Sequence, residues 1–132
     1  MSELQKQFIP FRQKPLEERK SKFRDLMSAN DQKIPIIFET SKKSKLLQKL
    51  NLRITVAKQM KFSKVTEHFR KQAKLNPSET IFFHCDNSKT ISPNSTIEEI
   101  YAKHKNSEDG FLYIECCEFD AWGASAETDQ IY

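Results

Sequence analysis

The sequence predicts an α+β fold: one small sheet packed against amphipathic helices within a single domain. Strand-like and helix-like segments follow one another along the 132 residues, with two strands before a central helix. Ten Phe residues supply a core, although only 37% of the residues are hydrophobic. The last strand-like run, residues 110–119, is the most strand-like in the chain. A chain of this length is large enough for a modest core of its own.

A helix is the first element that the sequence predicts. Residues 14–31, KPLEERKSKFRDLMSAND, carry an apolar stripe at helical spacing, made of Leu16, Phe23, Leu26 and Met27. Pro15 suits the first helical position, which needs no N–H donor. The preceding residues 1–13 are predicted to be extended, with Phe8, Ile9 and Phe11 as docking anchors.

Two strands follow this helix. KIPIIFET, residues 33–40, is short, apolar and β-branched, which predicts a largely buried strand. Pro35 indicates an early or irregular edge position in it. LNLRITVAK, residues 50–58, alternates between apolar and polar residues, with one face made of Leu50, Leu52, Ile54 and Val56. This alternation predicts a half-buried antiparallel strand.

Two further helices are predicted, each with an expected N-terminal cap. SKVTEHFRKQAKL, residues 63–75, has Ser63 as its expected N-cap and an apolar face made of Val65, Phe69 and Ala73. NSTIEEIYAKH, residues 94–104, places Ser95 three residues before Glu98, the spacing of a capping box.

The remaining strands complete the order of elements. TIFFHCDN, residues 80–87, precedes the short helix, and GFLYIECCEF, residues 110–119, follows it after a turn at Gly110. Two strands, a crossing helix and an apolar final strand are the order of a β-grasp fold. In that fold the first and last strands pair in parallel at the sheet centre. We therefore expect an N-terminal helical extension (1–33), a β-grasp domain (34–119) and a flexible C-terminal tail (120–132).

Catalytic, metal and cofactor chemistry finds little support in the residue pattern. The odd cysteine count argues against a disulfide framework, and adjacent Cys116 and Cys117 should point to opposite faces of a strand. The three histidines show no ligand spacing, and two glycines cannot form a phosphate-binding loop. No apolar run is long enough for a membrane span or a secretory signal. The pattern predicts a non-enzymatic binding module of the cytosol or nucleus, without cofactor or metal.

Charge is distributed unevenly along the chain. Residues 1–53 carry 13 Lys/Arg and 6 Asp/Glu, whereas residues 54–132 carry 9 and 12. The basic N-terminal half indicates an acidic partner such as a peptide or a lipid surface. Nucleic acid fits this pattern poorly, because Glu17, Glu18 and Asp25 lie on the same predicted helix and its aromatic residues have core spacing.

Several motifs in one order resemble a known family. KPLEERKSKFRDLMSANDQKIPIIFE, KVTEHFRKQAKLNPSETIFFHCDN, STIEEIYAKHKNSEDGFLYI and the terminal Trp-Gly pair are similar to the ubiquitin-like autophagy modifiers of the GABARAP and light-chain-3 type. The resemblance runs almost collinearly from about Phe11 to Gly123. It implies a ubiquitin-like β-grasp fold and a role in autophagy.

Gly123 lies in a polar tail where no turn requires a glycine, and the family resemblance implies a role for it. It implies that a dedicated cysteine protease cuts between Gly123 and Ala124, with Trp122 as a recognition anchor. Ubiquitin-like activating and conjugating enzymes would then join the glycine carboxylate to phosphatidylethanolamine. Glycine suits a narrow enzyme site because it has no side chain. The expected location is the cytoplasm, and the autophagosomal membrane through the lipid anchor.

The resemblance also implies that cargo receptors dock through short acidic peptides of the aromatic-x-x-aliphatic type, added as a strand to the edge of the second strand. The aromatic pocket would draw on Leu26, Pro35, Ile37, Arg53, Thr55 and Phe111. The aliphatic pocket would draw on Ile54, Val56, Met60, Val65 and Phe69. Lys33 and Arg53 would pair with acidic residues of the peptide.

The sequence departs from the family at positions that bear on peptide specificity. Thr55 stands where leucine is usual, Lys22 where many members have an acidic residue, Gln72 where arginine is common, and His68 where an apolar residue is frequent. Two other functions stay open: an autophagy modifier joined to a protein lysine, whose ending resembles AWG, and a β-grasp adaptor that is never conjugated. The N-terminal helix and the residues after Gly123 favour the lipid-linked type.

Overall fold

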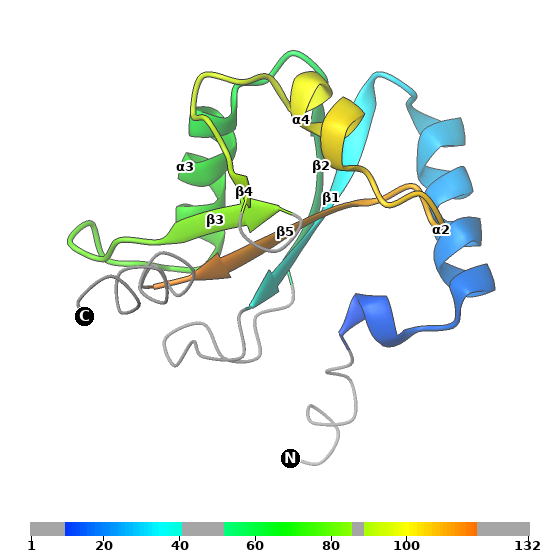
Figure 1. Ribbon diagram of the computed structural model, residues 1–132, viewed down its shortest axis with the longest axis horizontal. Coiled ribbons are helices and arrows are strands. Elements are labelled where there is room, and N and C mark those ends of the chain that lie inside the picture. The colour runs from blue at the N-terminus through cyan, green and yellow to red at the C-terminus, as the bar shows by residue number, and fades with distance from the viewer. Residues whose placement is uncertain (1–9, 41–51, 86–88, 119–132) are drawn as a thin grey trace, which may run out of the picture.

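The structure, a computed structural model, describes residues 10–40, 52–85 and 89–118. Helices lie on both sides of one sheet (Figure 1). In chain order the elements are the 3₁₀ helix η1 (Phe11–Gln13), α2 (Leu16–Ala29), β1 (Lys33–Thr40), β2 (Leu52–Ala57), α3 (Phe62–Gln72), β3 (Phe82–Cys85), β4 (Lys89–Thr90), α4 (Ile97–His104) and β5 (Leu112–Cys117).

The sheet has the strand order β2-β1-β5-β3-β4. β1 and β5 pair in parallel from Ile36↔Leu112 onward, and the other neighbouring strands are antiparallel. The predicted α+β fold with a parallel central pair is therefore confirmed. Pro35 lies early in β1, as predicted, but the predicted edge position is wrong, because β1 lies between β2 and β5. The sheet tolerates this proline because the pairing with β5 begins only at the next residue.

Each face of the sheet carries its own apolar cluster. Alternate residues of β1 point to opposite faces, so Ile36 and Phe38 join the larger cluster under α3 and α4, whereas Ile37 joins the smaller one under η1 and α2. Figure 1 shows α2 on one side of the sheet and α3 on the other. Burying a side chain as large as Phe69, which is 0% exposed, contributes about 1.5 to 3 kcal/mol.

Tertiary contacts decide where α3 begins. Lys61, not Ser63, is its N-cap, and no side chain caps the helix. The amide groups of Phe62 and Ser63 donate instead to the carbonyl oxygens of Ser95 and Pro93, at 2.9 and 3.0 Å. The Ser63 prediction is therefore wrong, because these carbonyls supply the acceptors that a capping side chain would offer.

The other predicted helix starts are each displaced by one residue. The capping box of α4 joins Thr96 and Glu99 in place of Ser95 and Glu98. With Thr96 as the N-cap, Ile97 and Ile100 face the core. The Ser95 carbonyl is then free to accept from the Phe62 amide at the start of α3. Pro15 is the N-cap of α2 and not its first helical residue.

The cysteines and Gly110 occupy the structural roles expected for them. Cys85, Cys116 and Cys117 are buried and form no disulfide. Burial raises the pKa of the Cys116 thiol, which argues against its use as a nucleophile. Gly110 has a φ of +90°, and the Phe23 ring lies 2.8 Å from the position that a Cβ atom would take there. A side chain at Gly110 would therefore be strained and crowded.

Candidate functional site

Strand β2 lies at one edge of the sheet, where a partner could add a further strand. Within the described residues its only sheet neighbour is β1, in the register Ile37↔Arg53 and Pro35↔Thr55. Arg53 and Thr55 are exposed, whereas Ile54 and Val56 turn toward the larger core cluster. The strand therefore presents an open backbone edge with a polar face and an apolar face.

A pocket of about 220 Å³ lies between α2 and the two strands β1 and β2. All six residues predicted for the aromatic pocket line it: Leu26, Pro35, Ile37, Arg53, Thr55 and Phe111. The other lining residues are Phe11, Lys22, Ile36 and Ile54. We call this cavity the α2–β2 pocket. Its floor is aromatic, since the rings of Phe11 and Phe111 meet edge to face with their centroids 4.8 Å apart.

The residues predicted for the aliphatic pocket lie on the opposite face of the sheet. Ile54 and Met60 are partly buried, and both pack against the larger core cluster. Val56 is 5% exposed, and Val65 and Phe69 are 0% exposed. A ligand could contact Ile54 and Met60 directly, whereas Val65 and Phe69 lie beneath that surface.

Four lining residues of the α2–β2 pocket were not predicted for it, and two of these, Lys22 and Phe11, lie outside the strands. Lys22 lies four residues before Leu26 on α2, so both project from the same helix face. That spacing is the signal that could have identified Lys22. Phe11, expected only as an anchor of the N-terminal segment, lies 5.2 Å below the Arg53 guanidinium, a cation–π distance. Lys33 is exposed at the start of β1, opposite Ala57.

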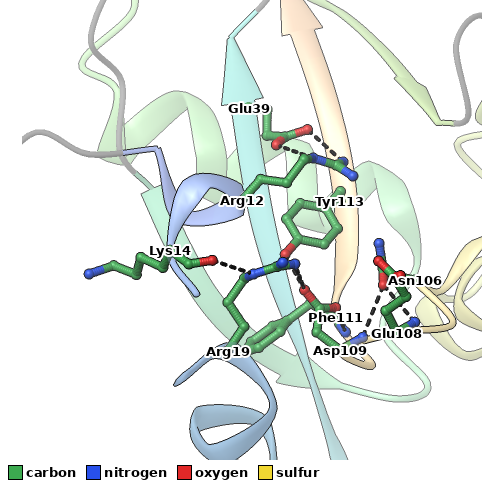
Figure 2. Close-up of polar contacts among 9 residues, drawn as sticks. All are labelled: Arg12, Lys14, Arg19, Glu39, Asn106, Glu108, Asp109, Phe111 and Tyr113. Carbon is green, nitrogen blue, oxygen red and sulfur yellow. Dashed lines mark hydrogen bonds and ion pairs between the residues drawn. The ribbon is translucent and has the colours of Figure 1, made fainter. Parts of the chain in front are cut away.

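Buried polar contacts hold α2 against the sheet (Figure 2). The Arg19 guanidinium donates to Asp109 at 2.7 Å and to the Lys14 carbonyl at 3.0 Å. Asp109 also accepts from the Tyr113 hydroxyl and from the Phe111 amide. Its side chain is 0% exposed, and that of Arg19 is 11% exposed. We call Arg19, Asp109 and Tyr113 the Asp109 clasp; no local sequence pattern predicted it.

A second ion pair fixes η1 to the same face. Arg12 donates twice to Glu39, at 2.8 and 2.9 Å, and its guanidinium lies 3.9 Å from the centroid of the Tyr113 ring. Such a bidentate pair orients both partners. Together with the Asp109 clasp it positions η1 and α2, which form one wall of the α2–β2 pocket.

Ionisation of Tyr113 should reduce stability at alkaline pH. Burial, aided by the hydrogen bond to Asp109, raises the pKa of this phenol above its ordinary value of 10.0. Because the unfolded chain releases the proton first, stability is full below pH 10.0 and falls as the pH rises above it. Urea unfolding at several alkaline pH values should show this loss, and Tyr113→Phe should show less of it. An equal loss in both proteins would contradict the assignment.

Metal sites and membrane spans are absent from the described ranges. In residues 10–40, 52–85 and 89–118, no group of three His, Cys, Asp or Glu side chains could hold a metal ion. None of the helices within those ranges has the length and apolar character to cross a bilayer.

Comparison with known proteins identifies the family. The family described as "Autophagy protein Atg8 ubiquitin like" matches residues 18–123, most of the chain. The chain belongs to the Atg8 family. Atg8-family proteins are non-enzymatic, ubiquitin-like modifiers of autophagy, so the predicted family and function class are confirmed at this level.

Individual Atg8 proteins agree with this assignment. The chain is 31% identical over 101 residues to autophagy-related protein 8 of Cochliobolus heterostrophus, covering 76% of this chain and 82% of that protein. The same protein of Neurospora crassa is also 31% identical, with 76% and 81% covered. The crystal structure of Trypanosoma brucei ATG8 superposes with a TM-score of 0.72 at 21% identity, covering 83% of this chain and 96% of that one. That structure supports the ubiquitin-like fold.

Proposed function

We propose that this Atg8-family protein is cleaved after Gly123 and joined through that glycine to phosphatidylethanolamine. The observation that carries the proposal is the end point of the family match, which falls on Gly123 itself. Trp122, Gly123 and Ala124 lie outside the described residues, which end at Glu118. Glycine suits the step because its backbone can enter a narrow protease or thioester site.

Cleavage and lipid conjugation require partner enzymes and place the protein in two locations. A cysteine protease removes residues 124–132, and ubiquitin-like activating and conjugating enzymes transfer the glycine to the lipid amine. The unconjugated chain belongs in the cytoplasm, and the lipid-linked chain belongs on the autophagosomal membrane. Anchoring there depends on the lipid.

Gly123→Ala should abolish the membrane-bound form. The added methyl group blocks processing and transfer, so the intact mass of the cellular protein should keep residues 124–132 and no lipid adduct should appear. Ser125→Ala is the matched control: that residue is removed with the tail, so processing should be unchanged. Loss of one discrete larger protein adduct would favour linkage to a protein lysine, and an uncut wild-type chain would favour an unconjugated adaptor.

We further propose that acidic aromatic-x-x-aliphatic peptides of cargo receptors dock on β2 as an additional strand. The α2–β2 pocket supports this, because Pro35, Ile37, Arg53 and Thr55 all line it from one face of the sheet. Ile54 and Val56 point to the other face. Side chains three positions apart on an added strand also point to opposite faces. The aromatic residue therefore meets α2, and the aliphatic residue meets the side of Ile54 and Met60.

The positions of the α2–β2 pocket and of the apolar surface at Ile54 and Met60 also determine the direction in which the peptide runs. Arg53 and Thr55 of β2 line the α2–β2 pocket, whereas Met60 lies beyond the C-terminal end of β2. A peptide whose aromatic residue precedes its aliphatic residue must then run parallel to β2. Lys33, opposite Ala57, lies at the end where the peptide finishes, and Arg53 lies at the end where it begins.

A further inference from the structure

A polar cavity of about 450 Å³ lies over three neighbouring strands of the sheet. Strands β1, β5 and β3 contribute Glu39, Glu115 and His84 to its lining. Arg12 of η1 and residues 104–107 at the end of α4 contribute two further walls. We call this cavity the Glu115 pocket. None of its described lining residues lines the α2–β2 pocket, so the two cavities are separate sites.

Three ionisable side chains stand side by side on the sheet at this pocket. The register pairs Glu115 with Glu39 of β1 and with His84 of β3. Neighbouring strands are about 4.8 Å apart, so side chains paired in this way are direct neighbours on one face. Glu39 follows Ile37 by two residues in β1, which places this row on the α2 side of the sheet. Glu115 is therefore flanked by a second carboxylate and by an imidazole.

The two carboxylates of the Glu115 pocket differ in how they are paired. Glu39 accepts two hydrogen bonds from Arg12, at 2.8 and 2.9 Å. In the part of the chain that the structure describes, the Glu115 side chain makes no hydrogen bond or ion pair. It is partly buried, and its pKa is raised by this burial and by the charge of Glu39, whereas Arg12 lowers it. A cation placed beside Glu115 would stabilise its charged form.

The basic residues of the pocket are engaged with other groups. The Arg12 guanidinium is held in its bidentate ion pair with Glu39. The Lys105 ammonium lies 5.6 Å from the centroid of the Tyr101 ring, and Tyr101 does not line the pocket. Neither cation is therefore placed to neutralise Glu115, and the carboxylate can accept from a cation that enters from outside.

We propose that the Glu115 pocket binds an arginine side chain of a partner protein, with the Glu115 carboxylate as the acceptor. A guanidinium forms two parallel hydrogen bonds with a carboxylate. It is also more weakly hydrated than an ammonium, so it loses less on entering a partly buried site. The cavity of about 450 Å³ has room for such a side chain. This interaction is separate from docking on β2 and can occur at the same time.

Two blocked peptides test the ligand. Acetyl-Gly-Arg-Gly-amide carries one guanidinium and no other charge, and the same peptide with citrulline in place of arginine keeps the shape without the charge. They are titrated into the full chain at about pH 7.5, where an ordinary histidine is mostly neutral. The arginine peptide should shift the amide NMR signals of Glu115 and its paired residues, with a Kd in the millimolar range. The citrulline peptide should bind at least about fivefold more weakly.

Glu115→Gln tests the residue. The change keeps the shape of the side chain but removes its charge, so the arginine peptide should bind about tenfold more weakly. Glu98→Gln is the matched control, because it makes the same change at an exposed residue of α4 that does not line the pocket, and it should keep full affinity. The melting temperature of Glu115→Gln should not fall, since the change removes repulsion between Glu115 and Glu39.

Three results would overturn this assignment of the Glu115 pocket. They are equal binding of the arginine and citrulline peptides, full affinity of Glu115→Gln for the arginine peptide, and no signal shift in the wild-type protein at peptide concentrations well above the millimolar range. None of these results depends on the acidic aromatic-x-x-aliphatic peptides. A failure of docking on β2 would therefore leave the arginine site standing, and the reverse also holds.

Discussion

Asp109→Asn should lower the free energy of unfolding by about 3 to 5 kcal/mol, the loss typical when one partner of a buried ion pair is removed. The Asp109 side chain is 0% exposed and accepts from Arg19, Tyr113 and the Phe111 amide. Asn keeps the shape of the side chain but removes its negative charge. The Arg19 guanidinium, 11% exposed, then stays buried without its counter-charge.

Urea unfolding at neutral pH would measure this loss. Glu18→Gln is the matched control, because it removes the charge of an exposed carboxylate that is 57% accessible and 3.5 Å from Lys14. That change should cost less than about 1 kcal/mol. A similarly small loss for Asp109→Asn would mean that the clasp contributes little to stability.

The Asp109 clasp also bears on the docking surface. Arg19 belongs to α2, the helix that carries Lys22 and Leu26 to the α2–β2 pocket, and Asp109 fixes the backbone beside Phe111. Loosening the clasp should therefore weaken peptide binding even at temperatures where Asp109→Asn remains folded. Stability and binding are linked here because one wall of the pocket comes from outside the sheet.

Regular periodicity explains why most of the fold could be predicted from the sequence. The alternation in residues 50–58 and the apolar run in residues 110–119 each gave a strand, and the order of elements gave the parallel central pair. The short strand β4 and the 3₁₀ helix η1 were not predicted, since two or three residues carry no period. The sequence misplaced the starts of α3 and α4 because the first amide groups of both helices donate to carbonyl oxygens that are distant in sequence.

The candidate site was less predictable because it depends on contacts between distant residues. The Arg19–Asp109 pair joins positions separated by 90 residues, and neither residue has a local pattern that indicates its partner. The family resemblance supplied six residues of the α2–β2 pocket but did not supply Lys22, which departs from the family. The resemblance also grouped Val65 and Phe69 with the ligand surface, because sequence alone does not separate core residues from apolar residues that line a groove.

Arg53→Glu combined with Thr55→Trp should weaken binding of acidic aromatic-x-x-aliphatic peptides by about thirtyfold, or about 2 kcal/mol. Both residues are exposed on the open face of β2, and both line the α2–β2 pocket. The indole would occupy much of a cavity of about 220 Å³, and the new carboxylate would repel the acidic peptide. Because neither side chain belongs to the core clusters, the melting temperature should change little.

The matched control for this double variant is Ala102→Trp combined with Lys103→Glu. It makes the same change in charge and adds the same indole at exposed positions of α4, outside β2 and the α2–β2 pocket. Titration calorimetry with one acidic peptide should show full affinity for the control and a large loss for the groove variant. The single changes separate two causes: the loss from Arg53→Glu should shrink as salt is added, whereas that from Thr55→Trp should persist, since it fills space and adds no charge. Equal affinities for groove and control variants would remove β2 as the docking edge.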